Sequence, residues 1–538
     1  MSPTASRRTG HDGRAVPGTA ASFTAPAGTP HARVAVIGAG FAGLGTAIAL
    51  RKRGIGTVVF ERADEVGGTW RDNTYPGCQC DVPSSLYSFS FAPNPDWTRT
   101  YPTQPELGAY LRRCAEESGV LPDIRFGHTV VDASWDAATA RWAVQTTGGT
   151  WTADILVVAN GPLAEPAIPE LPGLDTFEGT TFHSAAWDHQ HDLSGERVAV
   201  VGTGASAVQI VPGIQPVASR LLLFQRTPPW VLPHPDRPTR TAERALYRMF
   251  PPAQRLARAG VYWSRELVVL GMVKRPPLMR LLEGIARAHL RRHVPDPVLR
   301  AKLTPAYAAG CKRLLLSNRY FPAVGQPNVD VITEPIAEVR PHGIATADGT
   351  EHPVDTIVLA TGFRVTDNPT FERLHGTTGR SLAQTWAEDG LRAYLGSTVP
   401  GFPNMFVMAG PNTGIGHTSL LVMIEAQIHY LLGAIETLDR TGAKAFDVLP
   451  EPFAAYNESL QRSMAGTVWL TGGCASWYLD AEGRNTTLWP DWTWRFWMRT
   501  RHFDLAAYQQ IFSAVAAGDL STDDSVAGPP PAMATNGA

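Results

Sequence analysis

Apolar residues fall into two segments of the chain that share one order of elements. Residues 33–62 start with an apolar run, pass through a glycine-rich turn into an amphipathic stretch, and end in a second apolar run. Residues 197–226 repeat this order. Such a pattern predicts a strand, a tight turn, a helix and a second strand. The chain is therefore expected to contain two nucleotide-binding βαβ units.

Other stretches extend this picture. Apolar runs at 153–163 and 354–363 end in small-residue turns, which predicts strands at the crossings between two domains. Residues 241–300 are rich in Arg, Leu and Ala and poor in β-branched residues, which predicts a helical insertion. The apolar stretch 419–438 carries Glu425 and His429, so it is expected to be a buried helix rather than a membrane span.

The first glycine turn has the spacing that a dinucleotide needs. Gly38 allows the turn, Gly40 lets the backbone approach a pyrophosphate, and Gly43 permits close helix packing. The helix N-terminus then faces the phosphates. Glu61 ends the second strand, where a carboxylate accepts ribose hydroxyls. This unit predicts FAD binding, against the alternative of a glycine turn with no ligand.

The second unit differs where its second strand ends. Its turn has the GxGxxA form, with Gly202, Gly204 and Ala207, but the strand is followed by Arg226 and Thr227 instead of an acid. A carboxylate would repel the 2′-phosphate of NADPH, whereas a guanidinium binds it with charge-assisted hydrogen bonds. The second unit therefore predicts NADPH. The alternative for Arg226 is a solvated charge at a strand end.

Composition narrows the partners. The chain has 538 residues, enough for two or three domains, with 44% hydrophobic residues, 18% charged residues and a net charge of −2. No long basic run is present, so neither nucleic acid nor a membrane is expected as a partner. An odd number of sparse cysteines argues against a disulfide scaffold and favours a reducing compartment, the cytoplasm. The five are Cys78, Cys80, Cys114, Cys311 and Cys474.

A cluster between the two units resembles a family fingerprint. The pattern FxGxxxHxxxW followed by Pro or Asp is matched by Phe177, Gly179, His183, Trp187 and Asp188. With GGTW (67–70), GCKR (310–313) and DTIVLATGF (355–363), it resembles the single-chain FAD- and NADPH-dependent Baeyer–Villiger monooxygenases, the class B flavoprotein monooxygenases. Residues 410–421 and 474–497 resemble the branch of 4-hydroxyacetophenone monooxygenase.

The resemblance implies a fold and a division of the chain. The fold is α/β, with two Rossmann-like domains, the NADPH domain inserted in the FAD domain, and a helical insertion. The expected parts are a disordered segment (1–30), the first part of the FAD domain (31–165), a linker with the fingerprint (166–195), the NADPH domain (196–360) with its helical insertion (241–300), the second part of the FAD domain with a C-terminal covering region (361–518), and a disordered tail (519–538).

The resemblance also implies site residues. Arg313 matches an arginine at the flavin and Asp81 the acid beside it, while the fingerprint is expected to couple the domains, with proton transfer by His183 as the alternative. The alternative for Asp81 is a residue that caps the N-terminus of a helix. The alternative for Lys312 and Arg313 is a pair of surface cations on a loop that leads into a strand. Positions matching FAD contacts, besides the glycines, are Ala42, Glu61, Thr69, Trp70, Asp72, Asp81, Tyr87, Val131 and Leu420. Positions matching NADPH contacts are Gln79, Cys80, Gly202, Thr203, Gly204, Ala205, Ser206, Ala207, Val208, Arg226, Thr227, Lys312, Arg313 and Trp477.

The implied reaction inserts one oxygen atom of O2 next to a ketone carbonyl, giving an ester or lactone. A fixed cation near the reacting atoms would stabilise the oxyanion formed on the carbonyl, and an arginine stays protonated there. The expected partners are a small ketone and O2, in a monomer or homodimer without a metal. The alternatives are a flavin N- or S-oxygenase and a non-catalytic flavin protein. Most of the six tryptophans between 469 and 497 are expected in the core.

Overall fold

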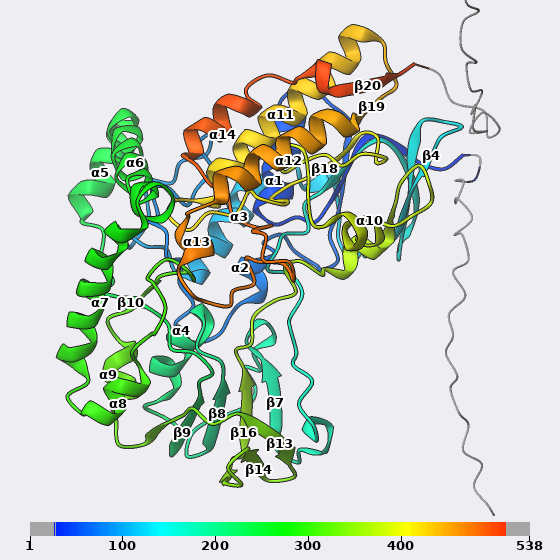
Figure 1. The fold of residues 1–538 in the computed structure, drawn as a ribbon. Coiled ribbons are helices and arrows are strands. Elements are labelled where there is room, and N and C mark those ends of the chain that lie inside the picture. Colours follow the sequence, from blue (N-terminus) through cyan, green and yellow to red (C-terminus); the bar gives the residue numbers. More distant parts are fainter. Residues whose placement is uncertain (1–25, 27, 513–538) are drawn as a thin grey trace, which may run out of the picture.

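The computed structural model describes residue 26 and residues 28–512. Most of the N-terminal segment expected to be disordered (1–30) and the whole of the expected tail (519–538) lie outside these residues. The described chain forms two main sheets with helices packed around them. A column of helices, drawn in green, runs along one side of the molecule (Figure 1).

The first sheet has eight strands in the order β17-β4-β5-β6-β1-β2-β3, with β18 also paired to β6. The long strand β6 pairs with different strands along its length. Its start pairs antiparallel with β5, and its end pairs in parallel with β18. The strands are β1 (His31–Ile37), β2 (Thr57–Phe60), β3 (Ile124–Arg125), β4 (Val130–Asp136), β5 (Arg141–Thr146), β6 (Gly149–Val158), β17 (Leu374–His375) and β18 (Met405–Val407).

The second sheet has five parallel strands in the order β12-β9-β8-β16-β7. Strands β1 to β6 precede it in the chain, and β17 and β18 follow it, so its domain is inserted in the first domain as expected. The strands are β7 (Thr180–His183), β8 (Arg197–Val201), β9 (Arg220–Phe224), β12 (Val329–Ile332) and β16 (Thr356–Leu359). Three small sheets pair β10 (Val231–Leu232) with β11 (Leu315–Leu316), join β13 (Ile336–Arg340), β14 (Gly343–Thr346) and β15 (Glu351–Pro353), and pair β19 (Ala445–Val448) with β20 (Tyr508–Ile511).

Both faces of each main sheet are buried, because helices or small sheets cover them. In β1, Val34 and Val36 belong to one buried cluster while Ala35 and Ile37 belong to another on the opposite face. This explains the continuous apolar runs in the sequence, which are typical of parallel strands covered on both sides. The first cluster also contains Val198 of β8, so one core runs through both domains.

The helices fall into three groups. Those around the first sheet are α1 (Phe41–Arg51), α2 (Thr69–Asp72), α3 (Gln104–Ser118) and α10 (Leu382–Asp389). Those of the inserted domain are α4 (Ala205–Ile214), α5 (Thr241–Met249), α6 (Pro251–Glu266), α7 (Met279–His293), α8 (Pro297–Lys302) and α9 (Tyr320–Val324). The C-terminal helices are α11 (Leu420–Thr441), α12 (Pro450–Met464), α13 (Val468–Thr471) and α14 (Thr493–Thr500). Residues 241–300 are largely helical, as expected.

Helix α11 is the one described helix whose length and composition would allow it to cross a membrane. Of its most apolar window, 67% is buried inside the protein. It lies over α1 and beside α14 (Figure 1). It is therefore a core helix, as its sequence predicted.

The expectation for the C-terminal tryptophans is wrong. Of the six, Trp469 and Trp489 are deeply buried and Trp492 packs partly buried against the core, but Trp477, Trp494 and Trp497 are 52%, 39% and 41% exposed. The sequence misleads here because α14 lies at the surface with Phe496 turned inward. Its tryptophans face outward beside α6 instead of filling the core.

The turn between β1 and α1 has room only for glycine at two positions. Gly38 has φ +98°, in the region that favours glycine. A methyl group at Gly43 would lie 1.8 Å from the carbonyl oxygen of Gly38. Since that oxygen belongs to the backbone of the turn, the turn itself would have to move.

We expect Gly43→Ala to lower the free energy of unfolding by roughly 1–3 kcal/mol, because the added methyl overpacks a fixed turn. The measurement is the thermal unfolding midpoint. The matched control is Gly260→Ala in α6, where a methyl group meets nothing within 4 Å. That variant should be unchanged or stabilised by up to about 1 kcal/mol. Equal midpoints for the two variants would contradict the steric argument.

Candidate functional site

The N-terminus of α1 is shaped to receive a phosphate group. Helix α1 has no side-chain cap at Gly40, so its first backbone N–H groups are available to a ligand. The nearest atom to a methyl group placed on Gly40 would be the Cα of Gly68, at 3.7 Å. The N–H of Gly67 donates to the carbonyl of Ala39 at 3.1 Å, which holds the GGTW segment against the turn. The two glycine-rich segments thus form one cradle.

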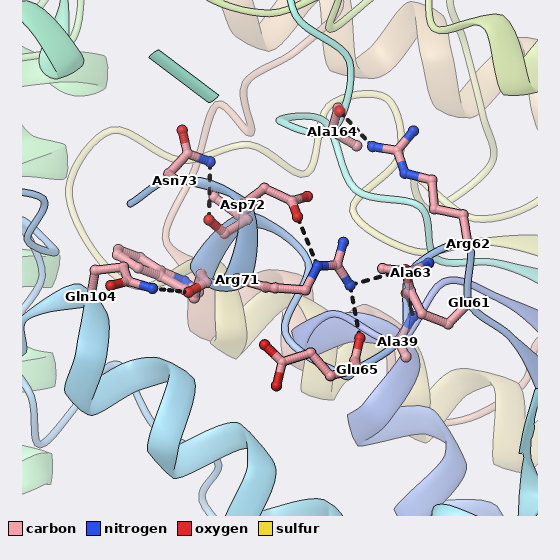
Figure 2. A network of polar contacts seen from close by, with 12 residues as sticks. Ala39, Glu61, Arg62, Ala63, Glu65, Arg71, Asp72, Asn73, Gln104 and Ala164 are labelled. Atoms are coloured by element: carbon pink, nitrogen blue, oxygen red, sulfur yellow. Dashed lines mark hydrogen bonds and ion pairs between the residues drawn. The ribbon is translucent and has the colours of Figure 1, made fainter. Parts of the chain in front are cut away.

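Glu61 lies at the end of β2 with 4% of its surface exposed. Its carboxylate accepts the N–H of Ala39 at 2.7 Å and that of Ala63 at 3.0 Å. It also accepts Nη1 of Arg71 at 3.0 Å (Figure 2). The predicted ribose-binding acid therefore stands directly beside the phosphate cradle, as its position at the strand end implied.

Arg71 is a site residue that the sequence analysis missed. Figure 2 shows its guanidinium between Glu61 and Asp72, with Nε donating to Asp72 at 2.7 Å. Burial alone would lower the pKa of Arg71, but the bonds and charges of Asp72 and Glu61 raise it. The only sequence signal was its place between two predicted FAD-contact residues. Its charge compensates a buried carboxylate at the cradle.

The other positions expected to contact FAD lie on several elements. Trp70 Nε1 donates to the hydroxyl of Tyr87 at 3.1 Å, and the ring of Tyr87 packs edge-on against Phe41, the first residue of α1. Thr69, Trp70 and Asp72 therefore lie on α2 next to the cradle, with Ala42 buried in α1. Val131 sits at a register shift in β4, and Leu420 begins α11.

The second glycine turn repeats the first. Gly202 has φ +113°, and a methyl group on it would lie 2.4 Å from the carbonyl oxygen of Ala360. Helix α4 begins without a side-chain cap, and a methyl group on Gly204 would meet open space. The hydroxyl of Thr203 donates to the carbonyl of Thr227 at 2.8 Å, which ties the turn to the end of β9. Ala205 and Ser206 open α4, and Ala207 and Val208 are buried in it.

Two cations, Arg226 and Lys312, lie close enough beside this turn for their charges to interact. Arg226 is exposed, and within residues 28–512 neither it nor Lys312 has a carboxylate partner. Burial lowers the pKa of Lys312, and the charge of Arg226 lowers it further. The ammonium of Lys312 also lies 5.3 Å from the ring centre of Tyr307. Two uncompensated cations at one place favour an anionic group such as a phosphate.

Asp81 and Arg313 meet across the two domains. Nε and Nη2 of Arg313 donate to the two carboxylate oxygens of Asp81 at 2.7 and 2.6 Å. Burial disfavours the charged form of Asp81, but Arg313 outweighs it and the pKa of the carboxyl is lowered. The charge of Asp81 raises the pKa of Arg313 against the effect of burial. Both groups are therefore ionised. No helix begins directly after Asp81, so it is not an N-cap, whereas Arg313 is 43% exposed and pairs with Asp81.

The loop that carries Asp81 also contacts α4. The backbone N–H of Gln79 donates to Oε1 of Gln209 at 3.2 Å, and Nε2 of Gln209 donates to the backbone carbonyl of Gln79 at 2.8 Å. Cys78 and Cys80 are free, buried thiols, and burial raises the pKa of Cys78 to about 12 and that of Cys80 well above its usual value. The C-x-C pair therefore packs as two neutral thiols between the domains.

The fingerprint lies at the connection between the domains. His183 ends β7, and its ring meets that of Phe363 at 5.7 Å between centres. Burial lowers the pKa of His183 more than the nearby backbone of Gly362 raises it, and no described residue lies within hydrogen-bond distance of its Nε2. Trp187 packs edge-on against Phe182 at 4.9 Å. Asp188 accepts the N–H of Gln190 at 2.9 Å, and Phe177 packs on the outer face of the second sheet.

Two connecting segments run side by side next to the fingerprint. Pro166 and Phe363 form an antiparallel bridge. The N–H of Ala167 donates to Gly362 at 2.9 Å, and that of Arg364 donates to Glu165 at 2.8 Å. A methyl group on Gly179 would lie 2.2 Å from the carbonyl oxygen of Asp355, so this glycine is required for the approach of β7 to the returning chain.

The cysteine count misled in one respect, since Cys311 and Cys474 form a disulfide. The two lie 163 residues apart and become neighbours only through the fold. The bond joins the loop of Lys312 and Arg313 to the segment of Trp477. Cys114 is the remaining free cysteine.

Another missed feature is a buried hydrogen bond between the inserted helices and the loop before α11. His417 Nε2 lies 3.3 Å from Glu266 Oε1, with side-chain exposures of 2% and 0%. Glu266 also accepts the N–H of Thr493 at 3.1 Å. Beyond this pair, an open groove of about 580 Å³ lies between α6 and α14, lined by Arg258, Tyr262, Trp263, Val422, Glu425 and Trp497 among others.

Comparison with known proteins identifies the family. Residues 31–239 match the family described as "Flavin-binding monooxygenase-like". A Baeyer–Villiger monooxygenase of Streptomyces coelicolor is 52% identical and spans 90% of this chain and 94% of that protein. A Baeyer–Villiger monooxygenase of Pseudomonas aeruginosa is 46% identical over 91% of this chain and 94% of that protein.

Solved structures agree with the sequence relatives. A closed crystal structure of cyclohexanone monooxygenase has a TM-score of 0.80 at 28% identity, covering 90% of this chain and 99% of that one. Oxidised steroid monooxygenase bound to NADP has a TM-score of 0.79 at 31% identity, covering 89% and 99%. Both glycine turns, the acid at the first and the cation pair at the second, fit the two nucleotides. The chain therefore belongs to the Baeyer–Villiger monooxygenases, which use FAD and NADPH.

Proposed function

We propose that this enzyme inserts one oxygen atom of O2 next to the carbonyl of a small ketone, with Arg313 and Asp81 at the reaction centre. The observation that carries the proposal is the bidentate pair at 2.6 and 2.7 Å between the two domains. When bound, FAD supplies the activation of dioxygen and NADPH supplies the hydride.

Arg313 is the group that would stabilise negative charge during the reaction. Attack on a ketone carbonyl places negative charge on its oxygen, and a fixed guanidinium close to that oxygen lowers the barrier. Asp81 holds the guanidinium by two bonds, so its direction is set before the substrate binds. Asp81 is thus proposed as the positioning residue and Arg313 as the catalytic residue.

The proposed nucleotide sites follow from the two cradles. FAD would take its phosphates at the N-terminus of α1 and its ribose at Glu61, with Arg71 compensating the charge of that acid. NADPH would take its pyrophosphate at the N-terminus of α4. Its 2′-phosphate would lie between Arg226 and Lys312, the two cations that have no acidic partner among residues 28–512.

We also propose the division of the chain expected from the resemblance, with the FAD domain in the segments 31–165 and 361–518 and the NADPH domain at 196–360. The shared sheet of β1 to β6 with β17 and β18 supports it. The fingerprint at 166–195 would couple the domains, because its strand β7 joins the sheet of the NADPH domain and His183 lies against Phe363 of the returning connection. We propose as well that the enzyme is cytoplasmic and that it belongs to the branch of 4-hydroxyacetophenone monooxygenase.

We expect Arg226→Ala to weaken NADPH binding and leave NADH binding nearly unchanged. Losing one charge-assisted phosphate bond costs roughly 1.5–3 kcal/mol, or about 10- to 150-fold in affinity. The measurement is the dissociation constant of each nucleotide by titration. Arg220→Ala is the matched control, since Arg220 is an exposed arginine at the start of β9, whereas Arg226 follows its end, and Arg220 is paired with Asp330 at 2.6 Å. Equal losses for NADPH and NADH would exclude phosphate recognition by Arg226.

We expect His183→Ala and Trp187→Ala to lower ester formation by about 10- to 100-fold while FAD stays bound, because small misplacements of reacting groups are costly. The measurements are ester yield, hydrogen peroxide release and bound flavin. His502→Ala, at an exposed side chain after the end of α14, is the control. Wild-type coupling in both fingerprint variants would reduce the motif to a packing role.

We expect Arg313→Ala to lower ester formation on the order of 100- to 1000-fold, since one stabilising contact to the developing oxyanion is lost. NADPH should still be consumed in part, with hydrogen peroxide as the product. Arg313→Lys keeps the charge without the planar fork and should retain more activity than alanine. The measurements are ester mass, NADPH consumption and peroxide.

Asp81→Asn serves as the second variant, because it removes the charge that orients Arg313 while preserving shape. It should show the pattern of Arg313→Ala in weaker form. A normal ester yield from Arg313→Ala would remove Arg313 from the reaction. Oxygenation of amines or sulfides but not ketones would instead support an N- or S-oxygenase.

A further inference from the structure

The disulfide links two segments that are already pressed together. Cys311 is fully buried, while Cys474 is half-buried between the exposed residues Gly473 and Ala475. The N–H of Ala308 donates to the carbonyl of Gly472 at 2.9 Å. A methyl group on Gly472 would lie 2.7 Å from the Cβ of Cys311, so this glycine is needed for the close approach.

Both segments carry residues of the proposed site. Cys311 directly precedes Lys312 and Arg313, and Cys474 lies three residues before Trp477. The next residue, Tyr478, is buried. Burial raises the pKa of Tyr478, and the charges of Arg313 and Asp81 act on it in opposite directions. The covalent bond therefore holds one wall of the proposed reaction centre to another.

We propose that Cys311 and Cys474 are a redox modification site, formed by exchange with a small disulfide such as glutathione disulfide. The thiolate of the more exposed Cys474 attacks the small disulfide, forming a mixed disulfide and releasing one thiol. The thiolate of Cys311 then displaces the second small thiol. The two cysteines lose two electrons and two protons, and the small disulfide is reduced to two thiols that take up both. Reduction is the reverse, with entry again at Cys474.

The bond sets how firmly the segment of Trp477 is held. When Cys311 and Cys474 form the disulfide, a covalent bond anchors residues 472–478 to the loop of Arg313. When the two cysteines are thiols, only the Ala308–Gly472 hydrogen bond and noncovalent packing hold the segment. Gly473, with φ +73°, then adds backbone freedom. We infer that the reduced enzyme binds NADP+ more weakly and releases more hydrogen peroxide. This functional part rests on the proposed roles of Arg313 and Trp477, whereas the formation of the bond does not.

Peptide mapping of the full-length protein tests the bond itself. The enzyme is equilibrated in glutathione buffers of high and low disulfide content, alkylated and digested with trypsin without reductant. In the oxidised sample, a cross-linked pair of the peptides 303–312 and 463–484 is expected. In the reduced sample both cysteines should be alkylated. Cys78, Cys80 and Cys114 should remain thiols throughout, and full alkylation of Cys311 and Cys474 in the oxidised sample would overturn the proposal.

Variants test the consequence. Between the two buffers, wild-type NADP+ affinity and the ratio of ester to peroxide should change on the order of tenfold, as expected for a displaced binding segment. Cys474→Ser should be fixed near the reduced values in both buffers, and Cys114→Ser should respond like wild type. Cys474 is chosen because it is less buried than Cys311 and is less apt to disturb folding. Identical behaviour of wild type and Cys474→Ser in both buffers would overturn the functional part.

The two proposals fail in different ways. If Arg313 proves dispensable for ester formation, the cross-linked peptides and the redox response of NADP+ affinity are still measurable. If the bond does not form, the losses in Arg313→Ala remain. Thermal unfolding of both redox forms adds a readout without catalysis, since a cross-link that closes a long loop should raise the midpoint of the oxidised form.

Discussion

The placement of the inserted domain against the first domain is the constraint on which the proposed site depends. One segment, residues 75–101, makes most of the polar contacts, including Asp81 with Arg313, Gln79 with Gln209, and Arg99 with Asp236 at 2.6 Å. Partly exposed ion pairs contribute only about 0–1 kcal/mol each. These contacts therefore fix the register of the domains, while the buried core common to both sheets supplies the stability.

The same logic applies to the cradle of the first domain. Glu61 is nearly fully buried, and such a carboxylate is costly unless it is paired and hydrogen-bonded. Two backbone N–H groups and Arg71 meet that requirement. The cradle is thus formed by the protein alone. An incoming ribose meets a carboxylate whose position is already set.

The sequence predicted the features that depend on local spacing. The two glycine turns, the acid at one strand end and the arginine at the other lie within single βαβ units, where chain geometry leaves few choices. The pairing of Asp81 with Arg313 was expected from resemblance, since the two residues are on different domains. Arg71 was missed because its role depends on a side-chain direction at a short helix, which spacing does not encode.

Features that depend on distant segments escaped prediction. Cys311 and Cys474 are separated by 163 residues, so a count of sparse cysteines pointed away from a bond that the fold makes. Glu266 and His417 likewise come from an inserted helix and a loop of the first domain. The tryptophans of α14 were expected in the core because apolar character alone does not reveal which side of a surface helix faces out.

The interrupted first sheet has a consequence for synthesis on the ribosome. Strand β6 is made early, but its neighbour β18 and the covering helix α11 follow the entire inserted domain. The inserted domain has all five strands of its own sheet within residues 180–359, so it is able to fold as a unit while the first domain is still incomplete. During that interval the end of β6 that later pairs with β18 is open on that side, and the face of α1 that meets α11 is exposed. The nascent chain is then most prone to aggregation, and a flavin available at this stage would find every position proposed to contact it except Leu420.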